Sequence, residues 1–191
     1  FGDVSLYFNN VNRTASFIFD NRSSFNIGNS NNFNKENITS FGATANNRYF
    51  TFGFRNHLIA NYNYFTDYYH SNQYTKVINL VQVYASKKFR LGKKWNYYLD
   101  AVLQQTDAAA PVKVPLLFTR SRLAFEGKFY RNLLLSAGLE ARYYTAYKAN
   151  NYSPVLGQFV PQDSMVIHNL PDIAVFIQYR IRGFSGYIRA E

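Results

Sequence analysis

The feature that most constrains the fold of this chain is a two-residue alternation of apolar and polar side chains. In residues 133–143 every odd position is Leu, Ala or Tyr, whereas Glu140 and Arg142 occupy even positions. Residues 173–181 repeat the pattern, with Ile, Val or Tyr at the odd positions and Arg180 on the other side. Successive side chains of a β-strand point to opposite sides. Both segments therefore predict strands with one apolar face and one charged face.

The aromatic content favours a β-barrel that spans an outer membrane. The chain has 17 Tyr and 18 Phe, and aromatic residues make up 19% of it. In outer-membrane barrels such rings form girdles at the membrane interfaces. No segment approaches the roughly 18 apolar residues that predict a transmembrane helix, so a bilayer would have to be crossed by strands. Tyr62, Tyr64, Tyr68 and Tyr69 are interpreted as part of a girdle, with an aromatic slide for sugars as the alternative.

The most regular part of the chain follows residue 47. Alternating runs predict eight strands there, at about 48–55, 57–68, 74–89, 94–106, 114–130, 132–147, 171–182 and 184–191. Turn-forming residues separate these runs in links of different length, at 91–94, 107–111, 130–132, 149–162 and 182–183. Short and long links roughly alternate, as the periplasmic turns and external loops of an outer-membrane barrel do.

The first part of the chain has a different composition. Residues 1–47 are rich in Asn, most of all over 26–37, which is turn and loop chemistry. Short β-like pieces are predicted within it at 4–8, 15–19 and 38–45, joined by a long polar loop. We therefore predict a single barrel unit over residues 1–191, in which 1–47 carries loops.

The predicted fold is an all-β, antiparallel transmembrane β-barrel, or the C-terminal portion of a larger one. Eight strands are enough for a small closed barrel whose interior is filled by side chains. Long charged side chains on the inferred inner face suit a wide, water-filled lumen better. The alternative fold is a soluble β-sandwich or a large curved sheet of a secreted protein, because alternation alone does not distinguish lipid from a protein core.

The side chains expected to line the lumen alternate with the apolar positions of the wall. They are Arg120, Arg122, Glu126, Lys128, Glu140, Arg142, Gln178, Arg180, Arg182 and Arg189. Basic members outnumber acidic ones, so a conducting pore should prefer anions. An alternative that is compatible with this role is that the charges pair as struts, with Glu126 or Glu140 against neighbouring arginines.

Several other functions are not expected from the composition of the chain and the spacing of its residues. It has no cysteine, which excludes disulfides, thiolate metal sites and thiol nucleophiles. Its net charge of +10 is scattered through the strands, so nucleic acid is not expected as a partner. None of the three histidines has metal-ligand spacing, and Ser164 with His168, the nearest catalytic candidate, is interpreted as a loop pair. We expect no enzyme activity, no metal and no cofactor.

A family resemblance is carried by the order of loose aromatic and proline markers. They are Asn61-Tyr62-Asn63-Tyr64-Phe65, Val114-Pro115, Arg120, Tyr130, Tyr144-Thr145-Ala146-Tyr147, Ala149, Asn151-Tyr152-Ser153-Pro154, Phe159, Gln162, Asn169-Leu170-Pro171-Asp172 and Ala174-Val175-Phe176. In this order they resemble the C-terminal part of the Putative porin family of the Bacteroidetes.

The resemblance implies an outer-membrane barrel of a Gram-negative bacterium, in a family whose full-length members are much longer. The chain stops at Glu191, whereas outer-membrane barrels usually end on an aromatic residue, which supports the expectation of a fragment. The expected function is a channel for passive diffusion of small hydrophilic solutes. The alternatives are a non-conducting subunit of a larger outer-membrane complex and the last strands of a plugged receptor. Expected partners are outer-membrane lipid, lipopolysaccharide and other outer-membrane proteins.

Overall fold

The computed structural model describes residues 2–19, 33–68, 70–130, 132–169 and 171–191. Within these ranges the chain forms β-strands and one short 3-10 helix, η1 (Phe17–Phe19), and no helix is long and apolar enough to cross a membrane. The strands are β1 (Asp3–Arg13), β2 (Glu36–Asn46), β3 (Phe50–Ala60), β4 (Tyr62–Phe65), β5 (Ser71–Tyr74), β6 (Ile78–Arg90), β7 (Trp95–Gln105), β8 (Leu117–Tyr130), β9 (Leu133–Tyr144), β10 (Asn151–Ser153), β11 (Gln158–Val160), β12 (Asp172–Ile181) and β13 (Phe184–Ala190).

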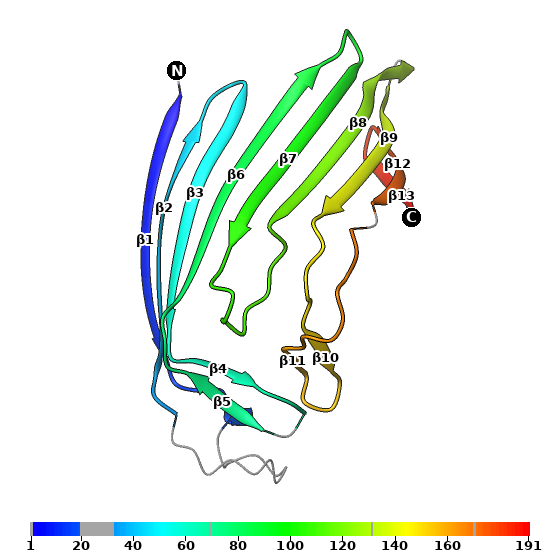
Figure 1. The fold of residues 1–191 in the computed structure, drawn as a ribbon. Coiled ribbons are helices and arrows are strands. Elements are labelled where there is room, and N and C mark those ends of the chain that lie inside the picture. Colours follow the sequence, from blue (N-terminus) through cyan, green and yellow to red (C-terminus); the bar gives the residue numbers. More distant parts are fainter. Residues whose placement is uncertain (1, 20–32, 69, 131, 170) are drawn as a thin grey trace.

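The main sheet has nine strands in the order β1-β2-β3-β6-β7-β8-β9-β12-β13. Every neighbouring pair is antiparallel, so the chain runs up and down through the sheet (Figure 1). Two short hairpins, β4-β5 and β10-β11, lie outside it. The predicted all-β antiparallel fold is confirmed.

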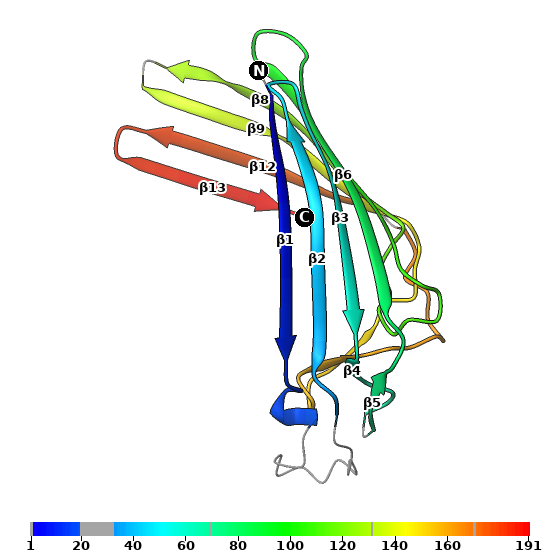
Figure 2. The same cartoon turned by 90° about the vertical axis from the view of Figure 1, so that its left-hand side faces the viewer.

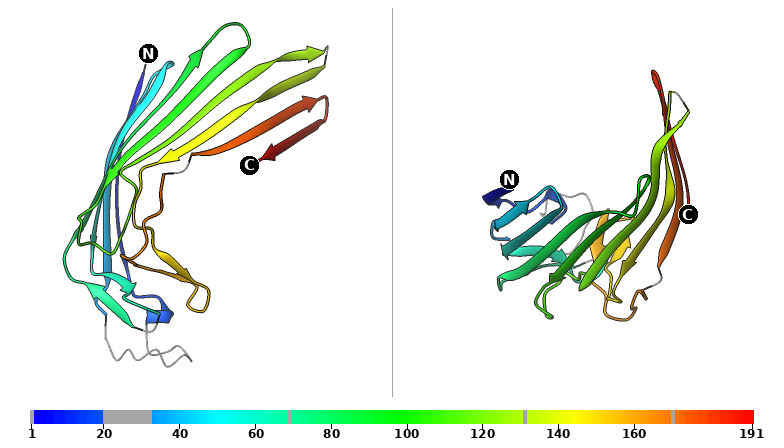
Figure 3. Two further views of the ribbon diagram at one scale, coloured as in Figure 1. Left: turned by 45° about the vertical axis from the view of Figure 1, so that its right-hand side comes forward. Right: turned by 90° about the horizontal axis from the view of Figure 1, so that it is seen from above.

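The sheet is strongly twisted and curved. Figure 2 shows β12 and β13 inclined steeply to β1 and β2, as the accumulated twist of many strands requires. Seen from above in Figure 3, the strands form an open arc. β1 and β13 are the two edges and do not pair with each other, so the closed barrel stays a prediction.

Several predicted boundaries in the first third are wrong. The two strands expected over 48–55 and 57–68 are one strand, β3, followed by β4, and the break falls at Asn61, which has a φ of 57°. The β-like piece expected over 15–19 contains η1 instead, and the expected strand 4–8 lies in the first half of the longer β1. The polar loop expected over 26–37 falls largely outside the described residues.

Short turns lie at one end of the sheet and long links at the other. β2-β3, β6-β7, β8-β9 and β12-β13 are joined by short turns, and two of these turns use glycines with positive φ, Gly92 at 145° and Gly183 at 76°. The links at the opposite end carry η1 and both small hairpins (Figure 1). The predicted alternation of short and long links is confirmed.

The long links share a small hydrophobic core. Phe19, Phe65, Leu156 and Val160 are all buried, and the rings of Phe19 and Phe65 stack with centroids 4.8 Å apart. These residues come from the β1-β2, β3-β6 and β9-β12 links. The β9-β12 link therefore reaches across from one half of the sheet to the other. Beside this core, burial raises the pKa of Tyr62, and the Glu36 carboxylate raises it further.

Gly138, in the middle of β9, leaves no space for a side chain. A Cβ there would lie 1.9 Å from the carbonyl oxygen of Leu123 in β8. Because the obstacle is backbone, no rotamer change can relieve the clash. Substituting Gly138→Val should therefore abolish folding or destabilise the protein by about 3 kcal/mol or more.

The matched control for this prediction is Gly127→Ala, because the nearest atom to a Cβ at Gly127 is a flexible Lys94 side-chain carbon 3.5 Å away. Circular dichroism and protease resistance in detergent should be normal for G127A and lost for G138V. A well-folded G138V protein would show that β8 and β9 do not approach each other as described.

Candidate functional site: the charged inner face

The strand register collects charged side chains on one face of the sheet. Asp100 of β7 pairs with Arg120 of β8, Arg120 pairs with Arg142 of β9, and Arg142 pairs with Asp172 of β12. Directly opposed residues in an antiparallel sheet share a face. We call the face that carries Arg120 the inner face, and the opposite one the outer face.

Nearly all predicted lining residues lie on this inner face. Those within strands are Arg120, Arg122, Glu126, Lys128, Glu140, Arg142, Gln178, Arg180 and Arg189. Arg182 does not belong to this set, because it lies in the turn between β12 and β13, beyond the last residue of β12. The alternation in the sequence therefore grouped these side chains on one face but extended one strand too far, and their role in lining a lumen stays a prediction.

The inner face is the concave face. A hollow near the long links is lined by Arg13 and Glu36 of the inner face together with Tyr62 and Gln158 of the small hairpins. Arg13 donates to Glu36 at 3.1 and 3.0 Å, and the Glu36 side chain is 5% exposed. The long links thus lie against the inner face, and Figure 3 shows them within the arc of the sheet.

Three arginines surround one acid at the centre of the inner face. The Glu140 side chain is only 4% exposed and accepts a bond of 2.6 Å from Arg120 of β8. Arg142 of β9 donates to it at 3.2 Å, and Arg189 of β13 donates at 3.2 Å. Arg142 also pairs with Asp172 of β12 and Arg189 with Glu191, so three acids balance the three arginines and the cluster links β8, β9, β12 and β13.

A second cluster forms around Glu126. Its carboxylate accepts hydrogen bonds from the Tyr98 hydroxyl at 2.6 Å and the Asn96 amide at 2.8 Å. Lys88 of β6 completes the cluster at 3.3 Å and also donates to the Tyr98 hydroxyl at 2.7 Å. The predicted pairing of an acid with neighbouring arginines is thus seen at Glu140, whereas the partner of Glu126 is a lysine.

Three other arginines of the inner face have no acidic partner among the described residues. Arg55 lies over the Tyr84 ring with 4.9 Å between its guanidinium carbon and the ring centroid. Arg122 lies 4.0 Å over the Phe176 ring, and Arg180 is exposed. None of the three forms a salt bridge within the described ranges, although the charge of Glu126 acts on Arg122 from a distance.

The outer face is apolar and exposed to its surroundings. Leu139 of β9 and Val175 of β12 pair directly and are 51% and 50% exposed, and Leu6 of β1 is 80% exposed. Towards the long links the outer face becomes polar, because Asn10 donates to Thr39 at 2.6 Å and Asn37 donates to Asn12 at 2.7 Å. A broad apolar patch of this kind marks a surface that faces lipid or another protein.

The two ends of the sheet differ in charge. The basic residues at the short-turn end are Arg48, Lys87, Lys88, Arg90, Lys93, Lys94, Lys128, Arg180 and Arg182, against Asp3 and Glu126 among the described acids. On the outer face at this end, Lys87 lies 4.7 Å over the Phe89 ring and Lys94 lies 5.6 Å over the Phe125 ring. Cations beside aromatic rings are typical of membrane interfaces.

Sequence reasoning missed the contribution of the earlier strands to the inner face. Arg55, Lys88, Tyr98 and Asn96 all belong to it but were not among the predicted residues. The signal was present, because polar residues also alternate with apolar ones in β6 and β7. The pairing of Lys88 with Glu126 needed the register, since 38 residues separate them in sequence.

The remaining site predictions have mixed outcomes. Tyr62 and Tyr64 stack in β4, which is outside the nine-stranded sheet, so they are not part of its wall, and Tyr69 lies outside the described residues. Ser164 donates to the Gln162 side chain, and no bond between Ser164 and His168 occurs in the described ranges. No described group of three or more His, Asp or Glu side chains could hold a metal. The absence of enzyme activity stays a prediction.

These observations define a class of protein whose antiparallel sheet separates a charged concave face from an apolar convex one. The family model described as Putative porin matches residues 2–191 of the chain. The chain therefore belongs to the Putative porin family. Comparisons with curated proteins and with solved structures find no match.

Removing the charge of Glu140 should destabilise the protein. In Glu140→Gln the three arginines lose their common acid and repel one another, so we expect a loss of about 2–3 kcal/mol. Thermal unfolding in detergent measures it, and added salt should restore part of the loss by screening the arginines.

A double variant distinguishes repulsion from a general packing defect. Glu140→Gln combined with Arg189→Gln should be more stable than Glu140→Gln alone, because one of the repelling charges is gone. If the double variant loses as much stability as Glu140→Gln and Arg189→Gln lose separately, added together, the cluster is not held together by charge.

Proposed function

We propose that this chain forms the wall of a water-filled β-barrel in the outer membrane of a Gram-negative bacterium. Small hydrophilic solutes would diffuse through it passively, with anions preferred. The observation that carries the proposal is that the same strands present an exposed apolar face on one side and a hydrated charged face on the other. Family membership as a Putative porin supports the same function.

The proposal requires the sheet edges to be paired. Unpaired backbone groups of β1 and β13 could not be left in lipid, where no water satisfies them. In the membrane they would pair with each other or with further strands of the protein. An origin in the Bacteroidetes and a place at the C-terminal end of a longer chain rest on the sequence resemblance.

The orientation follows from the lengths of the links. In outer-membrane barrels short turns face the periplasm and long loops face outwards, so the basic short-turn end would be periplasmic. The long links that cross the concave side would narrow the outer mouth. Arg55, Arg122 and Arg180 give the lumen unpaired positive charge, which favours anions in a channel of this kind.

One observation favours a second candidate function. The hydrophobic core of Phe19, Phe65, Leu156 and Val160 lies where the long links meet across the concave side. A core in this position could close the mouth, in which case the protein would be a non-conducting subunit of a larger outer-membrane complex.

Electrical recording in planar bilayers tests the proposal. The full-length protein should conduct, and its reversal potential in a salt gradient should report an anion preference. Arg55→Glu, on the inner face, should reduce that preference because it replaces an unpaired cation beside the permeation path.

Lys87→Glu is the matched control, since Lys87 lies on the outer face and is equally free of an acidic partner among the described residues. It should leave the anion preference unchanged. A folded protein that never conducts would refute the channel and favour the subunit, and equal effects of the two variants would refute the assignment of the faces.

A further inference from the structure

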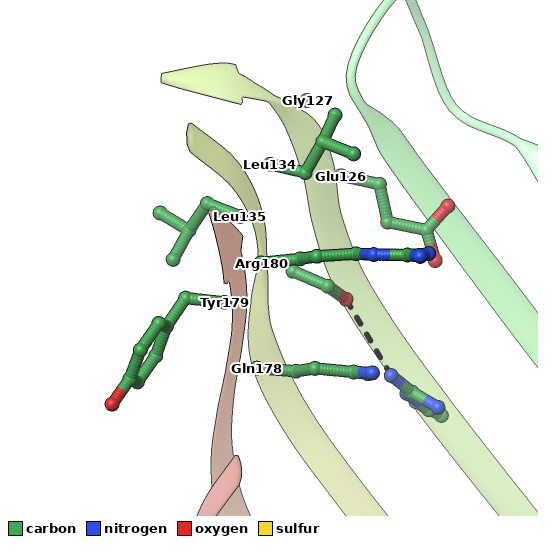
Figure 4. A pocket seen from close by; sticks show the side chains of 9 residues that line it. Glu126, Gly127, Leu134, Leu135, Gln178, Tyr179 and Arg180 are labelled. Atoms are coloured by element: carbon green, nitrogen blue, oxygen red, sulfur yellow. Dashed lines mark hydrogen bonds between the residues drawn. The ribbon is translucent and has the colours of Figure 1, made fainter. Parts of the chain in front are cut away.

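A hollow in the inner face brings together hydrogen-bond donors from β8, β9 and β12. Its polar lining consists of Arg122 and Glu126 of β8, Ser136 of β9, and Gln178 and Arg180 of β12. Figure 4 shows Gln178, Arg180 and Glu126 pointing to one side of the strands, whereas Leu135 and Tyr179 point to the other.

Arg122 is fixed by two aromatic rings and not by an acid. Its guanidinium carbon lies 4.0 Å from the centroid of Phe176 and 5.8 Å from that of Tyr98. Its one hydrogen bond within the described ranges is a long one, 3.5 Å to the Ser136 hydroxyl. Phe176 is itself only 2% exposed, so the platform under Arg122 is rigid. The guanidinium group is therefore held in place while most of its N–H groups remain available to a ligand.

Arg180 and Gln178 face the same hollow from the next strand. Both are exposed, and Arg180 forms no ion pair with any described residue. Gln178 pairs with Ser136 across β9 and β12, so its amide lies beside the Ser136 hydroxyl. Two guanidinium groups, one amide and one hydroxyl thus converge with few bonds among themselves.

Glu126 also lines the hollow and its charge acts on Arg122, but its carboxylate already accepts hydrogen bonds from three other groups. Tyr98, Asn96 and Lys88 all donate to its carboxylate, and Lys88 balances its charge. The hollow therefore keeps the charges of Arg122 and Arg180. Leu134 adds an apolar surface to the lining.

We propose that this hollow binds the carboxylate of a small sugar acid during its passage. The two oxygens of a carboxylate match the planar, forked donors of a guanidinium group. Two guanidinium groups that face one hollow therefore make a strong site for an oxyanion. Gln178 and Ser136 would bond sugar hydroxyls, and Leu134 would contact the apolar face of the ring. The inference deepens the proposed function and rests on it, since the inner face must line a path that solutes enter.

The test is titration calorimetry on the full-length protein in detergent, with glucuronate, glucose and glucose 6-phosphate as probes. Glucuronate should bind measurably and glucose should not, because the two differ only in the carboxylate. Arg122→Gln and Arg180→Gln should each weaken glucuronate binding about tenfold, as expected for loss of a charged hydrogen bond.

Arg55→Gln removes an equally unpaired cation from the inner face outside the hollow and should leave binding unchanged. Circular dichroism and thermal unfolding of each variant show whether it is folded. The site is refuted if glucuronate binds no better than glucose, or if Arg55→Gln weakens binding as much as Arg122→Gln. Tighter binding of glucose 6-phosphate would overturn the carboxylate assignment in favour of a phosphate.

Bilayer recording of the same samples separates this inference from the proposed function. Conduction without glucuronate binding would refute the hollow as a site and leave the channel intact. Binding without conduction would refute the channel and the passage of the ligand through it.

Discussion

The two-residue alternation of side chains along the strands is the constraint on which the rest of the structure depends. The register of backbone pairing between two strands also decides which face of the sheet each side chain occupies. A shift of one residue between two strands would move every charged side chain of one strand to the apolar face. The cluster around Glu140 is an example of side-chain contacts that depend on the register. Its arginines come from β8, β9 and β13, so they meet only when all the intervening pairs are in register.

The charges of the inner face divide into two groups with different consequences. Those around Glu140 and Glu126 pair with one another between adjacent strands and across an intervening strand, and they act as struts that allow the Glu140 carboxylate to be buried. Arg55, Arg122 and Arg180 lie against rings or are exposed, and no described acid pairs with them. A face built in this way combines paired charges at its centre with arginines that form no salt bridge, which is the arrangement that the proposed anion preference requires.

The sequence was most informative where alternation was longest. β7, β8, β9, β12 and β13 were predicted to within a few residues, because polar and apolar positions alternate through most of each strand. The break expected between 55 and 57 was wrong, since Asn56 and His57 simply face opposite sides of β3 and the chain turns at Asn61. Contacts such as Arg189 with Glu140, 49 residues apart, and the core formed by the long links depend on pairing across the sheet. Local pattern could not reveal them.

The central claim is that one face of the sheet contacts lipid and the other contacts water. The most direct test is to measure which of the two surrounds each residue along one strand. The chain has no cysteine, so single cysteines can be introduced along β6 at residues 81–86 and spin-labelled in bilayers. Labels at Val81, Val83 and Ala85 should be accessible to oxygen dissolved in lipid, and labels at 82, 84 and 86 to a water-soluble relaxation agent. A period of two in both signals is the predicted result. Labels that all meet water, or that show no period, would contradict a wall between lipid and a water-filled interior.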